Sequence, residues 1–177
     1  MSALGPVPGR YRVGPVAQLS VGVLPSELAR KAQARWLAGG RDAASARAII
    51  TLHVLEKTVE LVSELLPLLE LGELEACPPQ EQVPFQEGVA TGLVDGPRGL
   101  LAHTYRSDSQ GIITSATILT PTAQNEPWLA DLLTEAIDRE DVGRQAALEQ
   151  SIREADPCLP LSSAPEGQMG LRVDTQH

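Results

Sequence analysis

One long stretch, residues 42–71, constrains the fold of this chain more than any other part of the sequence. Its apolar side chains recur at alternating spacings of three and four residues, which places them on one face of a helix. This apolar stripe consists of Leu52, Leu55, Val59, Val62 and Leu66. Asp42 or Ser45 can cap the start of the helix, and Pro67 is expected to kink or end it. We expect the stripe to face the core and to pack on a sheet.

Weaker patterns on either side of this stretch predict the remaining elements. Ser26 is an acceptable N-cap for a helix over residues 27–38, which a Gly-Gly pair ends. Later helices are expected over residues 126–138 and 141–155. The expected strands cover residues 88–94, 98–105 and 111–119, with residues 106–111 as a hairpin loop. Two helical regions that flank a small antiparallel sheet predict an α+β fold that is mostly helical.

Length and composition fit a single domain over residues 1–177. Apolar residues make up 42% of the chain and aromatic residues only 3%, so Leu, Val, Ile and Ala must build the core. Residues 1–24 are rich in Gly and Pro without a clear period, which predicts an extended arm. Residues 162–177 are expected to be a polar tail.

The charge of the chain excludes one large class of function. The formal net charge is −9, whereas a nucleic-acid-binding protein needs a basic face to displace counterions. No run of apolar residues is long enough for a membrane span, and the first residues do not form a signal peptide, so we expect a cytoplasmic protein. The sequence contains no Ser-His-Asp order, P-loop, zinc-spaced pair or dinucleotide-binding glycine motif. A conventional hydrolase or nucleotide enzyme is therefore not supported.

Three sequence motifs carry more information than composition does. They are RYRVGPVAQL at residues 10–19, GVATGLVDGPRGLLAHTYRSDSQGIITSATILTPTAQN at residues 88–125, and IREADPCLPL at residues 152–161. In this order and spacing they resemble the C-terminal half of [NiFe]-hydrogenase large subunits, and most closely the cytoplasmic, cofactor-reducing groups. That family carries Y-x-V-G-P-L-A-R, E-A-P-R-G-x-L-x-H, P-T-x-x-N and D-P-C-x-x-C-x-x-H. The resemblance runs from about residue 10 to residue 161.

The resemblance implies a metal site of which this sequence keeps one part. In the family, four thiolates from two C-x-x-C pairs hold nickel and iron, which favour soft ligands. No cysteine precedes Cys77 here, so the first pair is missing. Cys158 aligns with the first cysteine of the second pair, whereas Leu161 takes the place of the second and Ala164 that of the following histidine. The family pattern therefore implies Cys158 as the one candidate metal ligand, with transient iron or nickel rather than a complete Ni-Fe centre.

Each candidate residue also has a structural interpretation. A free cysteine after a helix end, such as Cys158, can be a small packing residue instead of a ligand. Arg98 aligns with the arginine that overhangs the metal centre in the family, but Asp95 and Gly96 replace the family's Glu-Ala before it. We therefore interpret Arg98 as a retained element of the fold and assign no catalytic residue.

The remaining polar candidates have simpler explanations than chemistry. His103 lies on the same strand face as Leu101 and Tyr105, so we expect a buried, hydrogen-bonded histidine. Asn125 matches the end of P-T-x-x-N, but it is also a good N-cap for the helix that follows. Cys77 matches no motif of the family.

Three functions follow from the resemblance. The first is a hydrogenase maturation or assembly scaffold, like the large-subunit look-alikes that lack cysteines and assist formation of the iron cofactor. The alternatives are the C-terminal part of a split large subunit completed by a partner chain, and a purely structural subunit. The implied partners are hydrogenase maturation proteins or another hydrogenase subunit, and no hydrogenase activity is expected from the chain alone. Because Ala164 replaces the family's histidine at the processing site, residues 165–177 are expected to stay attached.

Overall fold

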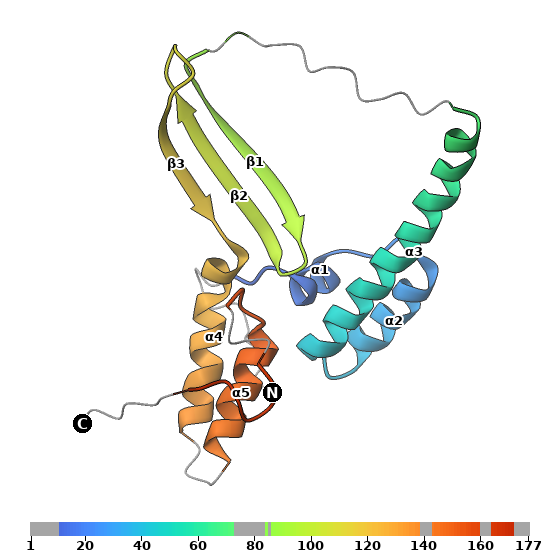
Figure 1. Cartoon of the computed structure of the whole chain (residues 1–177). Coiled ribbons are helices and arrows are strands. Elements are labelled where there is room, and N and C mark those ends of the chain that lie inside the picture. Colours follow the sequence, from blue (N-terminus) through green and yellow to red (C-terminus); the bar gives the residue numbers. More distant parts are fainter. Residues whose placement is uncertain (1–10, 73–83, 85, 139–142, 160–163, 172–177) are drawn as a thin grey trace. The chain divides into compact units, whose positions relative to one another are not determined.

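The computed structural model describes residues 11–72, 84, 86–138, 143–159 and 164–171. Cys77 and Leu161 lie outside these residues. In chain order the elements are α1 (Pro15–Val21), α2 (Glu27–Ala38), α3 (Ala43–Glu70), β1 (Gly88–Gly96), β2 (Gly99–Ser107), β3 (Ile113–Leu119), α4 (Pro121–Ile137) and α5 (Arg144–Ala155) (Figure 1). The fold is α+β and mostly helical, as predicted. No helix in this described part is both long and apolar enough to span a membrane.

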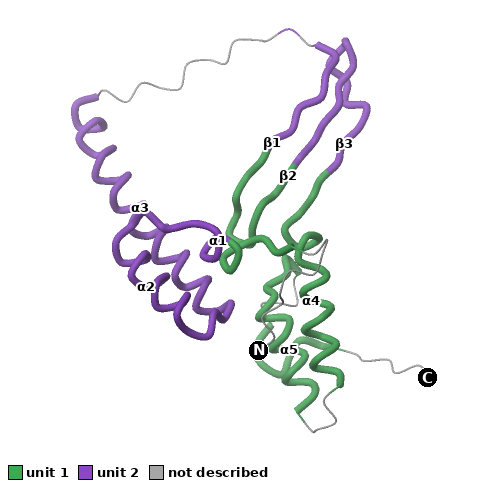
Figure 2. The backbone as a smooth tube through the Cα atoms, turned by 180° about the vertical axis from the view of Figure 1, so that it is seen from behind, with its two compact units in different colours: residues 1–17, 93–102, 118–177 green, residues 18–92, 103–117 purple. Residues whose placement is uncertain are grey.

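The chain forms two compact units, and the strands contribute to both (Figure 2). Unit 1 consists of residues 1–17, 93–102 and 118–177, and unit 2 of residues 18–92 and 103–117. The single domain expected from the sequence stays a prediction.

The core of unit 2 lies between α2 and the first part of α3. Ala29 and Trp36 of α2 and Ala46 and Ile49 of α3 are buried. The Trp36 indole N–H donates to the carbonyl oxygen of Asp42 at 2.8 Å, which ties the end of α2 to the start of α3. Asp42 also caps α3, because its carboxylate accepts from the Ser45 backbone N–H at 2.7 Å. Both helices thus begin and end close to the predicted residues.

The second part of α3 contradicts the expected packing of the apolar stripe. Leu55, Val59, Val62 and Leu66 are between 46% and 67% exposed, so the prediction that they face a core was wrong. The physical reason is length, since α2 has 12 residues and α3 has 28. At 1.5 Å per residue, α2 can cover only about 18 Å of a helix about 42 Å long.

Pro67 does not end α3 in the way the sequence suggested. It lies inside the last turns, and the helix continues to Glu70. The Leu71 backbone N–H still bonds to the Pro67 carbonyl at 3.0 Å, so the helix keeps its hydrogen bonding on the C-terminal side of the proline. The cost of a proline falls on the preceding turn.

The sheet contains three strands in the order β1-β2-β3, as the alternating patterns predicted. The β2–β3 hairpin is held by Asp108, whose carboxylate accepts from the backbone N–H groups of Gln110 and Ile112, both at 2.9 Å. This is the local side-chain capping that favours Asp in turns. The hairpin loop prediction is therefore confirmed.

The extended arm expected over residues 1–24 is interrupted by a helix. α1 runs from Pro15 to Val21 and buries Leu19, which is 1% exposed. Proline suits the first helical position because its φ is already helical and its missing N–H would have no partner there. A helix this short leaves no periodic signal, which explains why the sequence pattern missed it.

In unit 1, α4 and α5 pack against each other around Trp128, Ala136, Leu148 and Ile152. α4 begins five residues earlier than predicted, at Pro121, and its N-cap is Thr120. The Thr120 hydroxyl oxygen accepts from the Ala123 backbone N–H at 3.1 Å. The prediction of Asn125 as the N-cap was therefore wrong.

Candidate functional site

The three sequence motifs meet in unit 1, where hydrogen bonds and close backbone contacts join them. We call this cluster the motif junction. It consists of Val13 and Gly14 from the first motif, Arg98, Gly99, Thr122 and Asn125 from the second, and Asp156, Pro157 and Cys158 from the third.

Asn125 links the first two motifs through both ends of its side-chain amide. Its Oδ1 accepts from the Val13 backbone N–H at 3.0 Å, and its Nδ2 donates to the Val13 carbonyl at 3.1 Å. Asn125 is buried, at 8% exposure, and so both backbone groups of Val13 are satisfied away from water. The role of Asn125 is to hold the chain entering α1 against α4.

Two glycines allow the first two motifs to approach backbone to backbone. A Cβ added to Gly14 would lie 2.6 Å from the Arg98 carbonyl oxygen, and one added to Gly99 would lie 2.6 Å from the Gly14 backbone nitrogen. Both glycines also have positive φ, of 94° and 127°. Only glycine combines that conformation with the missing side chain, so neither position tolerates another residue without movement.

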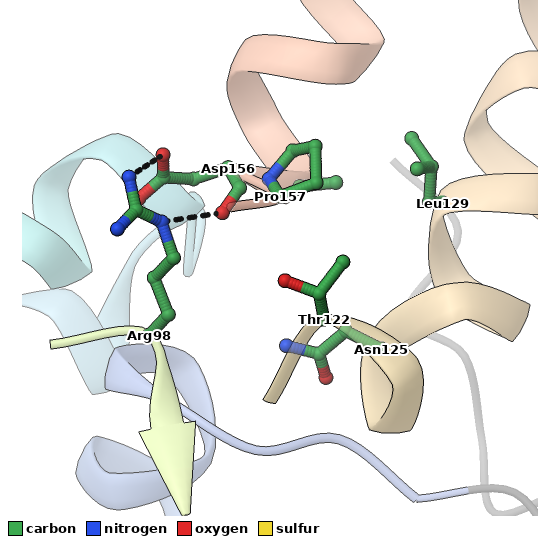
Figure 3. Close-up of a pocket in the computed structure, with 7 residues that line it drawn as sticks. Arg98, Thr122, Asn125, Leu129, Asp156 and Pro157 are labelled. Atoms are coloured by element: carbon green, nitrogen blue, oxygen red, sulfur yellow. Dashed lines mark hydrogen bonds and ion pairs between the residues drawn. The ribbon is translucent and has the colours of Figure 1, made fainter. Parts of the chain in front are cut away.

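Arg98 links the second motif to the third (Figure 3). Its Nε donates to the Asp156 carbonyl oxygen at 3.0 Å, and its Nη2 lies 3.3 Å from Asp156 Oδ1. Asp156 is the C-cap of α5 and adopts the left-handed conformation, with φ 47°, which Asp tolerates better than most residues. Arg98 therefore places its positive charge on the partly negative end of α5. Two donors of Arg98, Nε and Nη2, are engaged by Asp156, and the interpretation of Arg98 as a retained element of the fold stays a prediction.

Cys158 follows the end of α5 and is exposed. Its backbone N–H donates to the Thr122 hydroxyl oxygen at 3.0 Å, which fixes the backbone of the cysteine to the start of α4. The preceding Pro157 is buried, so the chain turns outward at the cysteine. This exposure contradicts the interpretation of Cys158 as a buried packing residue. It is compatible with a ligand role, because a metal ligand needs a reachable thiol.

A small hollow lies at the motif junction, and its lining contains no sulfur ligand (Figure 3). The lining consists of Arg98, Thr122, Asn125, Leu129, Ala155, Asp156 and Pro157. Within the described ranges, no three His, Cys, Asp or Glu side chains are grouped so that they could hold a metal ion. A centre that needs four thiolates does not fit the described residues, among which Cys158 is the one thiol.

The predicted histidine, His103, belongs to unit 2 and is not among the residues of the motif junction. His103 Nδ1 lies 2.8 Å from the Tyr105 hydroxyl oxygen, which confirms that the two side chains share a strand face. His103 is half-buried rather than buried, so that part of the prediction was wrong.

Sequence reasoning missed Arg12, which lies beside the motif junction. Its guanidinium carbon sits 3.3 Å from the centroid of the Trp128 ring, in a cation–π contact. Burial lowers the pKa of Arg12 to about 10, and the carboxylate of Glu154 partly opposes that shift. Its Nε is buried and has no hydrogen-bond partner among the described residues. The sequence signal for this contact is Arg12, the second arginine of the RYR triplet, which stands at a position that the family motif leaves open.

Sequence reasoning also missed how the chain after Cys158 is held. Glu149 of α5 is 2% exposed, and its Oε2 accepts from the Gly167 backbone N–H at 2.8 Å. Arg153 donates to the Ala164 carbonyl at 2.8 Å, and Met169 is buried. We call residues 164–170 the C-terminal strap. The predicted polar tail is thus bound to α5 where the structure describes it.

Comparisons with known proteins agree with the motifs. The NAD-reducing hydrogenase HoxS subunit beta of Cupriavidus necator is 32% identical to this chain, over 98% of this chain and 38% of the relative. A chain of the F420-non-reducing hydrogenase of Methanothermobacter thermautotrophicus is 30% identical, over 90% of this chain and 36% of the relative. No protein-family profile matches the sequence.

Comparison of the fold with solved structures points to the same group of proteins as the sequence comparisons. A solved structure of an NAD⁺-reducing [NiFe]-hydrogenase in the H₂-reduced state matches this chain with a TM-score of 0.68 and 27% identity, over 89% of this chain and 37% of that chain. The chain thus spans less than two fifths of the length of the relatives described here. The shared motifs, the sequence identity and the fold together show that the chain belongs to the hydrogenase family.

Proposed function

We propose that this chain is an assembly scaffold of the hydrogenase family, one that is related to the large subunit of these enzymes and works in the cytoplasm. It carries an iron-containing precursor as cargo, or positions another hydrogenase subunit, and does not complete a metal centre itself. The observation that carries this proposal is the motif junction, which keeps all three family motifs linked while offering one reachable thiol, Cys158.

The use made of each motif residue supports a scaffold over a catalyst. The family's active-site arginine aligns with Arg98, whose donors are engaged by Asp156. Both polar atoms of the Asn125 amide are engaged in holding Val13. With Leu161 in place of the second cysteine, the sequence lacks the bridging thiolate. These residues stabilise the family fold and leave Cys158 as the motif side chain open to a cargo.

A second function, the C-terminal part of a split large subunit, is favoured by a different observation. The chain spans 38% of the HoxS beta subunit, and four residues of the apolar stripe of α3, Leu55, Val59, Val62 and Leu66, are exposed. A partner chain that carries the missing part of a large subunit would cover such a surface. The Leu161 replacement counts against a complete centre in that assembly as well.

Infrared spectroscopy tests the scaffold proposal, because iron-bound cyanide and carbonyl absorb where protein does not. The chain would be co-expressed anaerobically with hydrogenase maturation proteins and purified as wild type, Cys158→Ser and, as the matched control, Cys77→Ser. We expect the bands in wild type and in Cys77→Ser and their loss in Cys158→Ser. Bands that survive in Cys158→Ser would overturn the role of that thiol. If no form carries them, the cargo function is refuted.

A further inference from the structure

The second part of α3 carries an apolar surface that the described part of unit 2 leaves uncovered. We define the distal stripe as the five exposed apolar residues of α3 that recur at spacings of three and four on one face, where their exposure is between 46% and 67%. They are Leu55, Val59, Val62, Leu66 and Leu69. Val54, Leu61 and Leu65 are exposed to a similar extent but lie at other positions around the helix. A soluble protein seldom keeps a contiguous apolar surface of this kind without a partner for it.

The spacing of the distal stripe indicates the geometry of what covers it. Its residues follow one another at intervals of four, three, four and three, which is the a/d pattern of a coiled coil. Such a seam receives the side chains of a second helix that lies nearly parallel or antiparallel to it. A flat sheet or an irregular loop does not match this pattern. A helix is therefore the element that this spacing fits best.

The charge of this part of α3 decides between a second copy and a different partner. Residues 54–70 contain four glutamates and one lysine. The lysine, Lys57, already pairs with Glu60. Glu70 lies beside the stripe, because it follows Leu69 by one position. The Glu56 carboxylate is engaged within the chain, since it accepts from the Leu28 and Ala29 backbone N–H groups at the start of α2. Two copies of α3 would bring like charges together, which is unfavourable in a coiled coil.

We propose that the distal stripe docks an apolar helix of a different polypeptide, one whose heptads are flanked by Lys and Arg. Opposite charges beside an apolar seam select the partner and its orientation. The proposal rests on the proposed function only for the identity of that polypeptide, which we expect to be a hydrogenase subunit or maturation protein.

Two synthetic helical peptides with identical Leu/Val heptads, one flanked by Lys and the other by Glu, test the docking surface on the full chain. We expect the Lys-flanked peptide to bind at least about tenfold more tightly, and added salt to weaken that binding. Equal binding of both peptides, or of neither, would overturn the proposal. Size-exclusion chromatography with light scattering gives the second check, because a stable homodimer blocked by stripe substitutions would assign the surface to a second copy.

Leu55→Ser and Leu61→Ser form a matched pair for the same assay. The two leucines are 57% and 55% exposed and lie on the same helix, but Leu61 lies about 120° around the helix from Leu55. We expect about tenfold weaker binding for Leu55→Ser and no change for Leu61→Ser. An equal loss for both variants would mean that the helix is recognised without the stripe, against the proposal. This assay needs no metal, so its failure and the failure of the cargo function are distinguishable.

Discussion

The motif junction and the distal stripe differ in where their side chains find partners. At the motif junction, Asn125 and Arg98 bind backbone or side-chain groups of the same chain, and two glycines permit backbone contact. On the distal stripe, five apolar side chains remain exposed. The polar side chains that join the motifs are paired within the described part of this chain, whereas the apolar side chains of the stripe have no described cover. The motif residues Arg98 and Asn125 hold the backbone of this chain together, and the distal stripe is the surface that we propose as a docking site.

The largest loss of stability is expected for Gly99→Ala, which changes a residue in close backbone contact at the motif junction. An alanine there would combine an unfavourable φ with a Cβ 2.6 Å from a backbone nitrogen. We expect a loss of about 3 kcal/mol in the free energy of unfolding, the upper end for a strained backbone position. The control is Gly40→Ala, where an added Cβ meets no atom within 4 Å. Denaturant melts in which both variants lose the same stability would contradict the importance of the contact.

Asn125→Ala should have the next largest effect. It leaves the Val13 N–H and carbonyl without their partners in a buried place, at a cost of about 2 kcal/mol. Asn125→Asp keeps the acceptor for the Val13 N–H but loses the donor to the Val13 carbonyl, so it distinguishes the contributions of the two hydrogen bonds. Equilibrium unfolding of wild type, Asn125→Ala and Asn125→Asp measures these differences in stability. Wild-type stability for Asn125→Ala would show that the side chain is not a link between the motifs.

A smaller, pH-dependent effect is expected at the C-terminal strap. The hydrogen bond from the Gly167 N–H, with help from Arg153 and the Met169 backbone, lowers the pKa of Glu149 below its usual value. A lowered folded-state pKa means that the strap is stabilised at neutral pH and loses this contribution as the pH falls through that pKa. The protection factors of residues 164–170, which are corrected for the intrinsic exchange rate at each pH, should therefore fall in acid, and in Glu149→Gln at neutral pH. Exchange in Glu149→Gln that matches the wild type at neutral pH would refute this role of the carboxylate.

The smallest effect is expected for Leu55→Ala on the distal stripe. Because Leu55 is 57% exposed, its truncation should change the free energy of unfolding by less than about 0.5 kcal/mol, as is usual for surface positions. A loss of about 2–5 kcal/mol, the range for a buried leucine, would instead mean that the stripe is part of a core. The same denaturant melts decide between these values.

Much of the fold could be predicted from periodicity alone. The helix over residues 42–71, the three strands and the two later helices produce long, regular patterns, and the structure confirms all of them. What periodicity could not give is the covering partner of each apolar face. It identifies which face of α3 is apolar, but the shortness of α2 decides that Leu55 and its neighbours stay exposed.

The candidate site was predictable in part, for a related reason. The family motifs identified Arg98, Asn125 and Cys158, and the structure brings them into one cluster. The pairings of Arg98 with Asp156 and of Asn125 with Val13 join residues 58 and 112 positions apart, and such polar contacts leave no periodic trace. The same holds for Glu149 and Gly167, which explains why the C-terminal strap looked like a plain polar tail.

Native-state hydrogen exchange of the full chain tests the contrast between the two regions most directly. We expect strong protection for Val13, for residues 99–101 and for α4 and α5, together with the first part of α3 over residues 46–53. We expect much weaker protection for α3 from Val54 to Glu70, where few side chains are buried to resist local opening. Equal protection along the whole of α3, or a motif junction that exchanges as fast as the distal stripe, would contradict the difference between the two regions.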